Sequence, residues 1–497
     1  MSQGWAVLRG GRVLDPAADA APPADILIEG GRISEIGAPG LAAPEGARLV
    51  DAADRLLIPG LVNAHTHGHG SLAKGWGDRA TLELLLNAGP WISGQRNLDD
   101  KRLAARLNAA EMLRRGCTAA YDLFLEIPTP TPEGVTAVAE SYAEVGVRAV
   151  VAPMMADRSL YEAVPGLLDA MPRHLRRRVE RLRAAPFEES LSMARDLLDA
   201  WAVDRARLRP ALAPTIPLHC SDAFLLACRD LATDYDVGLH MHLAESKVQA
   251  ISGLSVYGKT LTAHLDELGL LGPRFTAAHG NWLDGDDIAR LADNGASVAH
   301  NPGSNLRLGT GIAPVRRMRD GGLTVGVGTD GSSSADSQNM FEALRLAAYV
   351  SRVRTADYRD WIGAGEAFEM ATAGGARALG FDGEIGRLAP GYKADIVFLD
   401  LASFNYLPLN DALNQVVFCE NGSAVAAVMV DGVMVLEAGR LLNVDEARLR
   451  REVEAAVERL RGATREARAL AEKLADYVGL HCVGLAREPY HVNAHCG

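Results

Sequence analysis

Eight short apolar segments, separated by stretches of helical periodicity, are the feature that most constrains the fold of this chain. The apolar segments are residues 57–64, 118–123, 147–154, 208–215, 237–243, 275–279, 296–300 and 323–329. The helical patterns cover residues 102–115, 133–144, 187–201, 221–234, 285–294 and 338–352. Strands that alternate with helices form parallel sheets with right-handed crossovers. This α/β pattern predicts a (β/α)8 TIM barrel.

A doubly wound open sheet is the alternative α/β architecture for such a pattern. It would need a glycine-rich phosphate-binding turn after an early strand. The sequence has no such turn, so the barrel is the better prediction. The length of 497 residues exceeds that of one ordinary domain, so further structural parts are expected outside the barrel.

The two ends of the chain carry a different β pattern. Residues 5–37 contain short apolar strands with glycine turns, and residues 392–440 repeat this pattern with an Asp-Gly hairpin turn. We expect both segments to pair into one small β-sandwich domain. Residues 444–477 are rich in Ala, Glu, Arg and Leu and predict a long amphipathic helix. The expected parts are a sandwich of 1–58 and 383–442, a barrel of 59–382 and a helical C-terminal extension of 443–497.

Charge and composition exclude several classes of partner. The chain has 51 Lys and Arg against 63 Asp and Glu, a formal net charge of −12, and no long basic run. This balance argues against nucleic acid or an anionic membrane as a partner. No apolar run approaches the roughly 18 residues of a membrane helix, and the first residues lack the pattern of a signal peptide. The six scattered cysteines form no CxxC pair, so we expect a reducing, cytoplasmic setting.

A pair of histidines follows the first predicted barrel strand. His65-Thr66-His67 comes after an apolar run, 56–62, that contains a Pro-Gly turn. Residues two apart on a strand point to the same face, so the two imidazoles project together. Two neutral imidazole nitrogens on one face can bind a transition metal. This motif alone is weak evidence, because buried histidines often have a purely structural role.

Four further barrel strands also end in polar or titratable residues. The fifth strand carries His240 and His242 and is followed by Glu245, and the sixth ends in His279. The seventh ends in His300 and the eighth is followed by Asp330. In a (β/α)8 barrel the active site lies at the carboxyl ends of the strands. We therefore expect these groups to converge on one mouth of the barrel.

The same segments together resemble the amidohydrolase superfamily. The resemblance is carried by PGLVNAHTH, HMHLAES, AAHG, HNPGSNLRLGTG and VGTDG, and it extends over about residues 5–440. It is strongest toward the hydrolytic deaminase and aminohydrolase branch, which includes cytosine and guanine deaminases, adenosyl-homocysteine deaminases and triazine hydrolases. The resemblance implies a (β/α)8 barrel with a β-sandwich built from both chain ends, in agreement with the pattern described above.

The resemblance also implies a metal site. His65, His67 and His242 match the imidazole ligands of the family, and Asp330 matches its carboxylate ligand. Three nitrogens and one oxygen suit one divalent metal per subunit, with Zn²⁺ as the first choice and Fe²⁺ as the alternative. Binuclear relatives carry a bridging lysine on the fourth strand. The fourth strand here, 208–215, has no lysine, which favours a single metal.

Three catalytic roles follow from the resemblance. Glu245 matches the proton shuttle that takes a proton from water and delivers it to a substrate nitrogen. His279 matches the residue that hydrogen-bonds and orients this water. Asp330 can accept a proton while it also serves as a ligand. A bound divalent metal lowers the pKa of water toward neutrality, so that hydrolysis needs no strong base.

Possible substrate contacts come from the loops after the strands. The loop after the first strand carries Trp76, Asp78 and Arg79, which could hold a flat polar compound by stacking and hydrogen bonds, or could be ordinary loop residues. Asp122 and Asp157 follow the second and third strands and could bind amino groups. His240 points to the same side as His242, as a substrate contact, a supporting donor or a buried spacer. The lid pattern of thioadenosine-specific relatives is not found, which weakens a nucleoside substrate.

We expect a metal-dependent hydrolytic deaminase that releases ammonia from a small nitrogen-rich molecule. The candidates are aminopurines, pterins, triazines and acyclic guanidine-type compounds such as guanylurea. The alternative is an amidohydrolase, alkylamine hydrolase or dechlorinase acting on a similar core. A non-catalytic scaffold is disfavoured because every predicted ligand and catalytic residue is present. The long C-terminal helix and the resemblance predict a homodimer or homotetramer.

Overall fold

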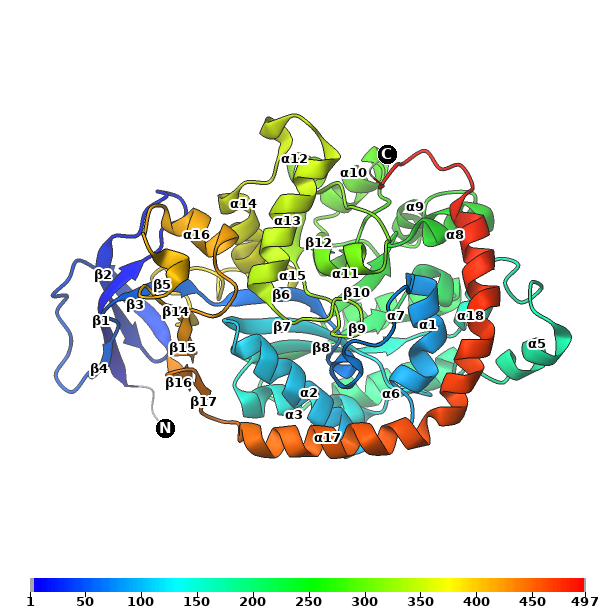
Figure 1. Cartoon of the computed structure of the whole chain (residues 1–497), viewed down its shortest axis with the longest axis horizontal. Helices are drawn as coiled ribbons and strands as arrows, with labels where there is room; N and C mark the ends of the chain where they lie inside the picture. The colour runs from blue at the N-terminus through cyan, green and yellow to red at the C-terminus, as the bar shows by residue number, and fades with distance from the viewer. Residues whose placement is uncertain (1–3, 496–497) are drawn as a thin grey trace.

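The computed structural model describes residues 4–495 and contains an eight-stranded parallel sheet that forms the barrel (Figure 1). Neighbouring strands pair in the order of the sequence, from β6 to β13. The strands are β6 (Leu61–Thr66), β7 (Cys117–Phe124), β8 (Arg148–Met155), β9 (Leu208–Pro214), β10 (Gly238–Leu243), β11 (Phe275–His279), β12 (Ser297–His300) and β13 (Thr324–Val327). The predicted (β/α)8 architecture is therefore confirmed.

Contacts between the first and last strands close the barrel. The Asp330 amide donates a hydrogen bond to the His65 carbonyl over 2.9 Å, and the Thr329 amide donates to the side chain of Asn63 over 3.0 Å. Gly328 is needed at this closure, because a Cβ there would lie 2.3 Å from Asn301 Oδ1 and 2.8 Å from the His65 backbone. Closure thus places the end of β13 directly beside the end of β6.

Helices with clear start signals cover the outside of the barrel. Asn97 and Asp100 form a capping box at α2, and Asp284 and Asp287 form another at α10. α3 begins with a proline in its first turn and ends at Gly146 in the left-handed conformation. The main outer helices are α2 (Leu98–Leu113), α3 (Pro132–Val145), α6 (Phe187–Asp199), α7 (Asp222–Asp234), α8 (Lys247–Tyr257), α10 (Gly285–Asp293) and α13 (Met340–Arg354).

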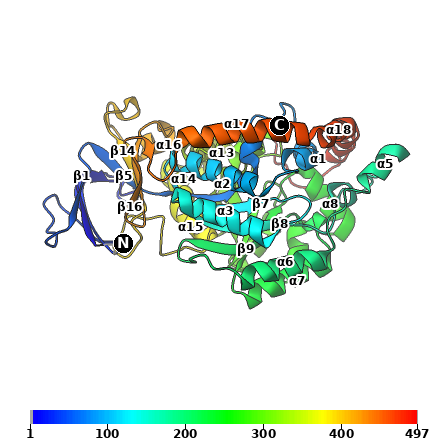
Figure 2. The same ribbon diagram turned by 90° about the horizontal axis from the view of Figure 1, so that it is seen from below.

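The N-terminal segment and residues 396–441 form a second lobe, at the left of Figures 1 and 2. Its strands are β1 (Trp5–Val13), β2 (Pro23–Glu29), β3 (Arg32–Gly37), β4 (Arg48–Asp51), β5 (Arg55–Pro59), β14 (Ile396–Asp400), β15 (Val425–Val430), β16 (Val433–Glu437) and β17 (Arg440–Leu441). They belong to one nine-stranded sheet in which β14 pairs antiparallel with β5. The expected pairing of both ends is confirmed, although the strands form one continuous sheet. We retain the domain limits 1–58, 59–382, 383–442 and 443–497 as a proposal.

The prediction of a single strand over residues 57–64 is wrong. The chain leaves β5 of the nine-stranded sheet at Pro59 and enters β6 of the barrel at Leu61. Gly60 lies between them, and a Cβ at this position would lie 2.1 Å from the Thr118 hydroxyl. The Gly60 amide donates to the Asp395 carbonyl over 2.9 Å. One apolar run therefore serves two sheets, which periodicity alone does not reveal.

The predicted single helix over 444–477 is in fact two helices, α17 (Glu446–Ala463) and α18 (Arg465–Ala486). The helix breaks at Thr464, whose hydroxyl donates to the Leu460 carbonyl over 2.8 Å. α17 crosses the barrel against α2, and α18 then turns along a different face of the molecule (Figure 1). The turn carries the chain to α1 (Leu82–Ile92), against which α18 packs.

The C-terminal tail returns to the barrel. The His491 ring hydrogen-bonds Asp284 over 2.8 Å, and the Ile312 amide donates to the Ala494 carbonyl over 2.7 Å. Cys496, one of the six cysteines of the chain, lies outside the residues that the structure describes. Within residues 4–495, no helix is both long and apolar enough to cross a membrane.

Candidate active site

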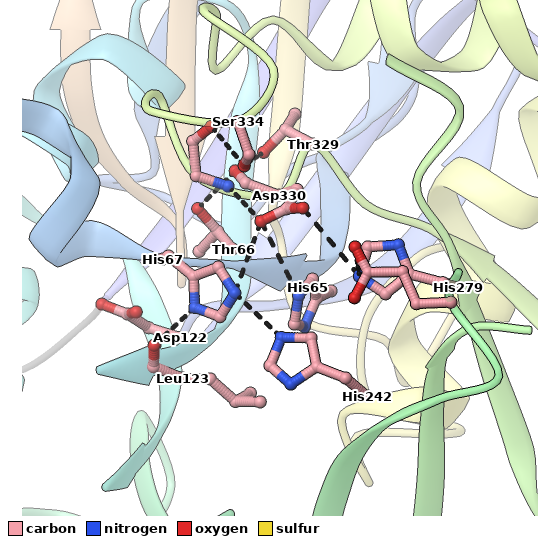
Figure 3. A network of polar contacts seen from close by, with 12 residues as sticks. His65, Thr66, His67, Asp122, Leu123, His242, His279, Thr329, Asp330 and Ser334 are labelled. Carbon is pink, nitrogen blue, oxygen red and sulfur yellow. Dashed lines mark hydrogen bonds and ion pairs between the residues drawn. The ribbon is translucent and has the colours of Figure 1, made fainter. Parts of the chain in front are cut away.

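Polar side chains at the carboxyl ends of four barrel strands lie close together (Figure 3). His65 belongs to β6 and His67 follows it, while His242 lies in β10. His279 is the last residue of β11, and Asp330 lies just after β13. Parallel strands in a barrel bring their carboxyl ends to one mouth. The structure therefore brings together the four predicted ligands and His279.

The spacing of these groups suits one small cation. His67 Nε2 lies 3.1 Å from His242 Nε2 and 3.4 Å from Asp330 Oδ1. His65 Nε2 lies 3.9 Å from the same Asp330 oxygen. A tetrahedral zinc ion bound at about 2.0–2.2 Å separates its ligand atoms by about 3.3–3.6 Å. The four residues therefore match the size and donor set of a zinc site.

The protonation of two histidines provides a separate test of this fit. His67 Nδ1 lies 2.7 Å from the Leu123 carbonyl, and His242 Nδ1 lies 2.8 Å from the Thr215 carbonyl (Figure 3 shows the first). A carbonyl only accepts, so each Nδ1 carries the hydrogen and each Nε2 presents a lone pair. Two lone pairs 3.1 Å apart repel each other unless a cation lies between them. Carbonyl partners of this kind also orient metal-binding histidines.

The surroundings of His65 also support a metal site. Its side chain is fully buried, and neither ring nitrogen has a hydrogen-bond partner among residues 4–495. Burial, followed by the neighbouring His67 and His240 rings, lowers the pKa of His65 well below its ordinary value. The ring is therefore neutral. A buried imidazole without a partner is costly, and coordination of a metal would satisfy it.

Glu245 and His279 lie next to the ligand cluster. Glu245 Oε1 is 3.6 Å from His279 Nε2, and His279 Nε2 is 3.9 Å from Asp330 Oδ2. Burial, followed by the charges of Asp330 and Glu83, raises the pKa of Glu245 well above its ordinary value. Burial also lowers the pKa of His279. A carboxyl group that can hold a proton thus faces a neutral imidazole, which suits general acid–base chemistry.

Three residues of the site have left-handed backbone conformations. Asp330 has a φ of 61°, His279 has 73°, and Ala244, just before Glu245, has 48°. Residues other than glycine seldom adopt this region, and such strain gathers at functional sites. Burial acts to raise the pKa of Asp330, but the His67 and His279 rings outweigh it and the pKa is lowered. Asp330 is therefore held as an anion.

A cavity of about 390 Å³ opens from the cluster toward solvent. His67, His242, Glu245 and Asp330 form its floor, and its walls are mostly apolar. The wall residues include Leu82, Leu85, Leu86, Pro90, Ile127, Met154, Leu160 and Leu182, with Arg158, Arg181 and Arg183 toward the outside. This size suits a small aromatic compound.

Two of the six predicted substrate-binding residues have protein partners. Asp122 is fully buried and accepts hydrogen bonds from the Gly68 amide over 2.9 Å and the Tyr142 hydroxyl over 2.8 Å. Burial raises its pKa to about 6. Asp157 accepts from the amide and hydroxyl of Ser221, over 2.8 and 2.5 Å. Neither residue lines the cavity as the described residues define it, and their contact with substrate stays a prediction.

The other four predicted substrate-binding residues also lie away from the walls of the active-site cavity. Trp76, Asp78 and Arg79 line a different cavity, behind α1, and the Trp76 ring donates to the Ser333 carbonyl over 2.6 Å. His240 is fully buried below His65, with its ring 4.4 Å from that of Tyr121. His240 is buried as a spacer would be, but neither of its ring nitrogens has a hydrogen-bond partner among residues 4–495, unlike the hydrogen-bonded spacer expected from the sequence. A role in substrate binding stays a prediction for all four.

Two cavity-lining histidines were not predicted. His69 follows His67 by two residues, and its Nδ1 accepts a hydrogen bond from the Leu125 amide over 3.0 Å. His219 lies after β9, and burial lowers its pKa to about 4. The continued alternation His65, His67, His69 could have indicated the first. For the second, the only signal is a histidine shortly after the fourth strand.

A (β/α)8 barrel with this donor set at its strand ends defines a metal-dependent hydrolase. Residues 56–435 match the model of the amidohydrolase family, and the chain belongs to this family. The protein is therefore an enzyme, a hydrolase that acts on C–N bonds other than peptide bonds.

Similar proteins of named activity cover most of the chain. A 5-methylthioadenosine/S-adenosylhomocysteine deaminase from Syntrophomonas wolfei is 32% identical over 426 residues, or 85% of this chain and 90% of that protein. A 5′-deoxyadenosine deaminase from Methanothermobacter thermautotrophicus is 33% identical over 440 residues, or 88% and 95%.

Solved structures give a similar picture. An adenosine deaminase from Xanthomonas campestris with bound zinc has a TM-score of 0.81 and 28% identity, covering 92% of this chain and 98% of its own. An atrazine chlorohydrolase from Arthrobacter aurescens complexed with zinc has a TM-score of 0.80 and 27% identity, covering 91% and 99%.

Proposed function

We propose that the protein is a zinc-dependent deaminase that hydrolyses an amidine-like C–N group of an aminoheterocycle and releases ammonia. The observation that carries this proposal is the arrangement at the barrel mouth. Two imidazole nitrogens with opposed lone pairs lie 3.1 Å apart, beside a buried carboxyl group that faces a neutral histidine. The deaminases among the similar proteins support the same reaction class.

We further propose an adenosine-type substrate, with the amino group on the six-membered ring as the leaving group. The names of the similar deaminases support this choice over a pterin, a triazine or guanylurea. The apolar walls of the cavity suit a purine ring with an apolar substituent on its sugar. The absence of the thioadenosine lid pattern from the sequence argues against a close match to those relatives.

In this proposal His65, His67, His242 and Asp330 hold one divalent metal, with zinc favoured and iron as the alternative. When bound, the metal would supply an acidified water as the nucleophile. His279 Nδ1 donates to Asn305 Oδ1 over 2.9 Å, so its Nε2 is free to accept a hydrogen bond. His279 can thereby orient the attacking water toward the substrate.

Two carboxyl groups move the protons. Glu245 takes a proton from the attacking water as its oxygen bonds to the carbon that bears the amino group, and passes this proton to the adjacent ring nitrogen. Asp330 Oδ2 accepts the second proton and delivers it to the amino group. The C–N bond then breaks, ammonia leaves, and the carbon keeps the oxygen as a carbonyl. The raised pKa of Glu245 suits a group that both takes and gives a proton.

A substrate panel tests the proposal. Zinc-loaded protein is assayed for ammonia release from 5′-methylthioadenosine, 5′-deoxyadenosine and adenosine, with guanine, a pterin, an aminotriazine and guanylurea alongside. We expect kcat/KM above about 10⁴ M⁻¹s⁻¹ for an adenosine-type compound. If the zinc-loaded protein releases no ammonia from any of them, the proposal is wrong.

The Glu245→Gln variant is the matched control for the panel. It keeps the shape of the side chain but removes the proton carrier, so we expect turnover to fall about 10²- to 10⁴-fold. Its zinc content, measured by elemental analysis, should equal that of the wild type because Glu245 is not a proposed ligand. A fully active Glu245→Gln variant would refute the assigned role.

Hydrolysis of another leaving group is the second candidate. The structural similarity to atrazine chlorohydrolase favours it, since a similar site could release chloride or an alkylamine from a triazine core. Identification of the released product as ammonia, amine or chloride separates the two candidates.

We also propose that the enzyme is a cytoplasmic homodimer or homotetramer. Two large apolar side chains that lie three residues apart in the sequence are exposed to solvent, Phe404 at 92% and Leu407 at 57%. Exposed apolar groups of this kind often mark contacts between subunits. A protomer-sized mass by light scattering would overturn the assembly proposal.

A further inference from the structure

Helix α1 has two different buried faces. Its residues Leu82, Leu85 and Leu86 line the active-site cavity. Glu83 and Asn87, one turn apart, point to the protein instead, and both are almost fully buried at 5% and 3% exposure. The cavity face can be explained by substrate binding. A buried carboxylate on the other face calls for its own explanation, because burial of a charge is costly.

The Glu83 carboxylate contacts the segment that carries the proposed proton shuttle. The Ser246 hydroxyl donates to Glu83 Oε1 over 2.8 Å. Ser246 directly follows Glu245 and caps α8, since its hydroxyl accepts from the Gln249 amide over 3.2 Å. The Gln249 side chain in turn accepts from the Glu245 amide over 3.0 Å. Glu83 thus supports one end of a short hydrogen-bonded unit around Glu245.

The position of Glu245 depends on this backbone support. Glu245 Oε2 is buried and has no hydrogen-bond partner among residues 4–495, and Oε1 is 3.6 Å from His279 Nε2. The side chain itself is therefore weakly held. The backbone is fixed instead by Gln249 and by the Asn281 amide group, which donates to the Glu245 carbonyl over 2.9 Å. Residues that fix this backbone set where the carboxyl group lies.

We propose that Glu83 is a positioning residue, which couples the substrate-facing wall α1 to Glu245 through Ser246. The inference rests on the proposed function, in which Glu245 moves the proton. A substrate that contacts Leu85 and Leu86 contacts α1. The same helix carries the Glu83 carboxylate that accepts the hydrogen bond from Ser246. Loss of the Glu83 contact then lets the Glu245 segment shift while the metal ligands stay in place. His65, His67 and Asp330 come from other strands, and the Thr215 carbonyl holds both the ring and the amide of His242, the ligand that shares β10 with this segment.

Kinetics of matched variants on one helix test the inference. Glu83→Ala should lower kcat about 10- to 100-fold with little change in KM, because a small misplacement of a catalytic group is costly. Glu83→Gln should stay within about threefold of wild type, since the amide oxygen accepts the same hydrogen bond from Ser246. Ser246→Ala should resemble Glu83→Ala, and the double variant should lose no more than either single change.

Asn87→Ala is the control for a general loosening of α1. The Asn87 amide donates to the Ala471 carbonyl of α18 over 2.9 Å and its oxygen accepts from Tyr161 over 2.9 Å, so it holds the same helix without contact to the Glu245 segment. We expect Asn87→Ala to lower Tm at least as much as Glu83→Ala but to keep the wild-type kcat. Equal losses of kcat in both variants would overturn the positioning role.

A crystal structure of zinc-loaded Glu83→Ala separates this inference from the proposed function. We expect the Glu245 carboxyl group to move by more than about 0.5 Å, the tolerance of a productive site, with the metal ligands unmoved. An unmoved Glu245 would refute the inference even if the enzyme is a deaminase. A shifted Glu245 in a protein that turns over no tested compound would keep the inference and refute the proposed function.

Discussion

Two buried polar clusters lie at opposite ends of the barrel. They differ in whether their own side chains offset the cost of burying polar groups. At the strand carboxyl ends, His65, His67 and His242 present ring nitrogens toward one another, and burial lowers the pKa of His65 and His242. At the junction with the nine-stranded sheet, opposite charges meet instead. The guanidinium of Arg148 donates to Asp431 over 2.8 Å and to Asp395 over 3.4 Å.

The charges of the second cluster pair without any added group, although Arg148 Nε is buried without a hydrogen-bond partner among residues 4–495. Lys393 also donates to Asp431 over 3.1 Å, and the Asp431 amide donates to Asp395 over 2.8 Å. The histidine cluster lacks such complementarity, because lone pairs face lone pairs. A buried cluster of like groups therefore indicates a ligand-binding site, whereas a cluster of opposite charges indicates a structural connection between domains.

Metal removal is the strongest test of this contrast. We expect dialysis against a chelator to lower activity by at least about 10³-fold, because the metal contributes several kcal/mol to transition-state stabilisation. Added zinc should restore activity and raise the free energy of unfolding, by about 2.7 kcal/mol at a zinc concentration 100 times Kd.

Two variants serve as controls for the zinc-removal experiment. His242→Ala should lose the zinc-dependent rise in Tm, and Arg148→Met should keep it because Arg148 lies at the other end of the barrel. A chelated protein that retains full activity would contradict the assignment of the histidine cluster.

The Arg148→Met variant tests the second cluster, in which Arg148 pairs with Asp395 and Asp431. Removal of one partner from a buried ion pair leaves the carboxylates of Asp395 and Asp431 without their main counter-charge, so we expect a loss of about 3–5 kcal/mol in the free energy of unfolding. Urea denaturation measures this loss. The kcat of the folded protein should be unchanged.

The pH dependence of this loss has a definite sign. In the wild type, burial raises the pKa of Asp395, whereas Arg148 outweighs burial at Asp431 and helps to hold its pKa below the ordinary value. Loss of Arg148 raises both folded-state pKa values, so each carboxyl group destabilises the fold more at neutral pH. As the pH falls through these raised pKa values the groups are protonated, so the difference from wild type should shrink on acidification. A difference that grows on acidification would exclude this explanation.

An exposed ion pair provides the smallest effect in the comparison. His491 in the tail contacts Asp284 over 2.8 Å, and about half of its side chain is exposed to solvent. Surface pairs contribute less than about 1 kcal/mol, so His491→Ala should lower Tm only slightly. A loss as large as that of Arg148→Met would mean that the tail has a far greater structural role than its exposure indicates.

Much of the fold could be predicted because strand and helix periods are local properties of the sequence. Each expected end of a barrel strand lies within four residues of the observed end, and several coincide with it. Two errors arose where tertiary structure divides a continuous pattern. The run around Pro59 and Gly60 serves two sheets, and the amphipathic stretch around Thr464 bends to follow the surface of the barrel.

The predicted metal ligands come together because strand order alone fixes their positions at the barrel mouth. The cavity walls could not be predicted in the same way. Trp76 lies on the far side of α1 from the cavity, whereas Leu85 and His219 line it. Which side of a loop faces a substrate depends on how helices pack over the mouth, and no local pattern records this packing.

The contact between α1 and α18 has a consequence for the order in which this enzyme is made. α1 is synthesised early, near residue 82, but the helix that supports it begins only at Arg465. Domains form while the chain emerges from the ribosome, with the N-terminal parts first. The wall over the substrate thus gains its support only after α18 has been synthesised, so a nascent chain that has assembled the barrel strands still has an unsupported pocket.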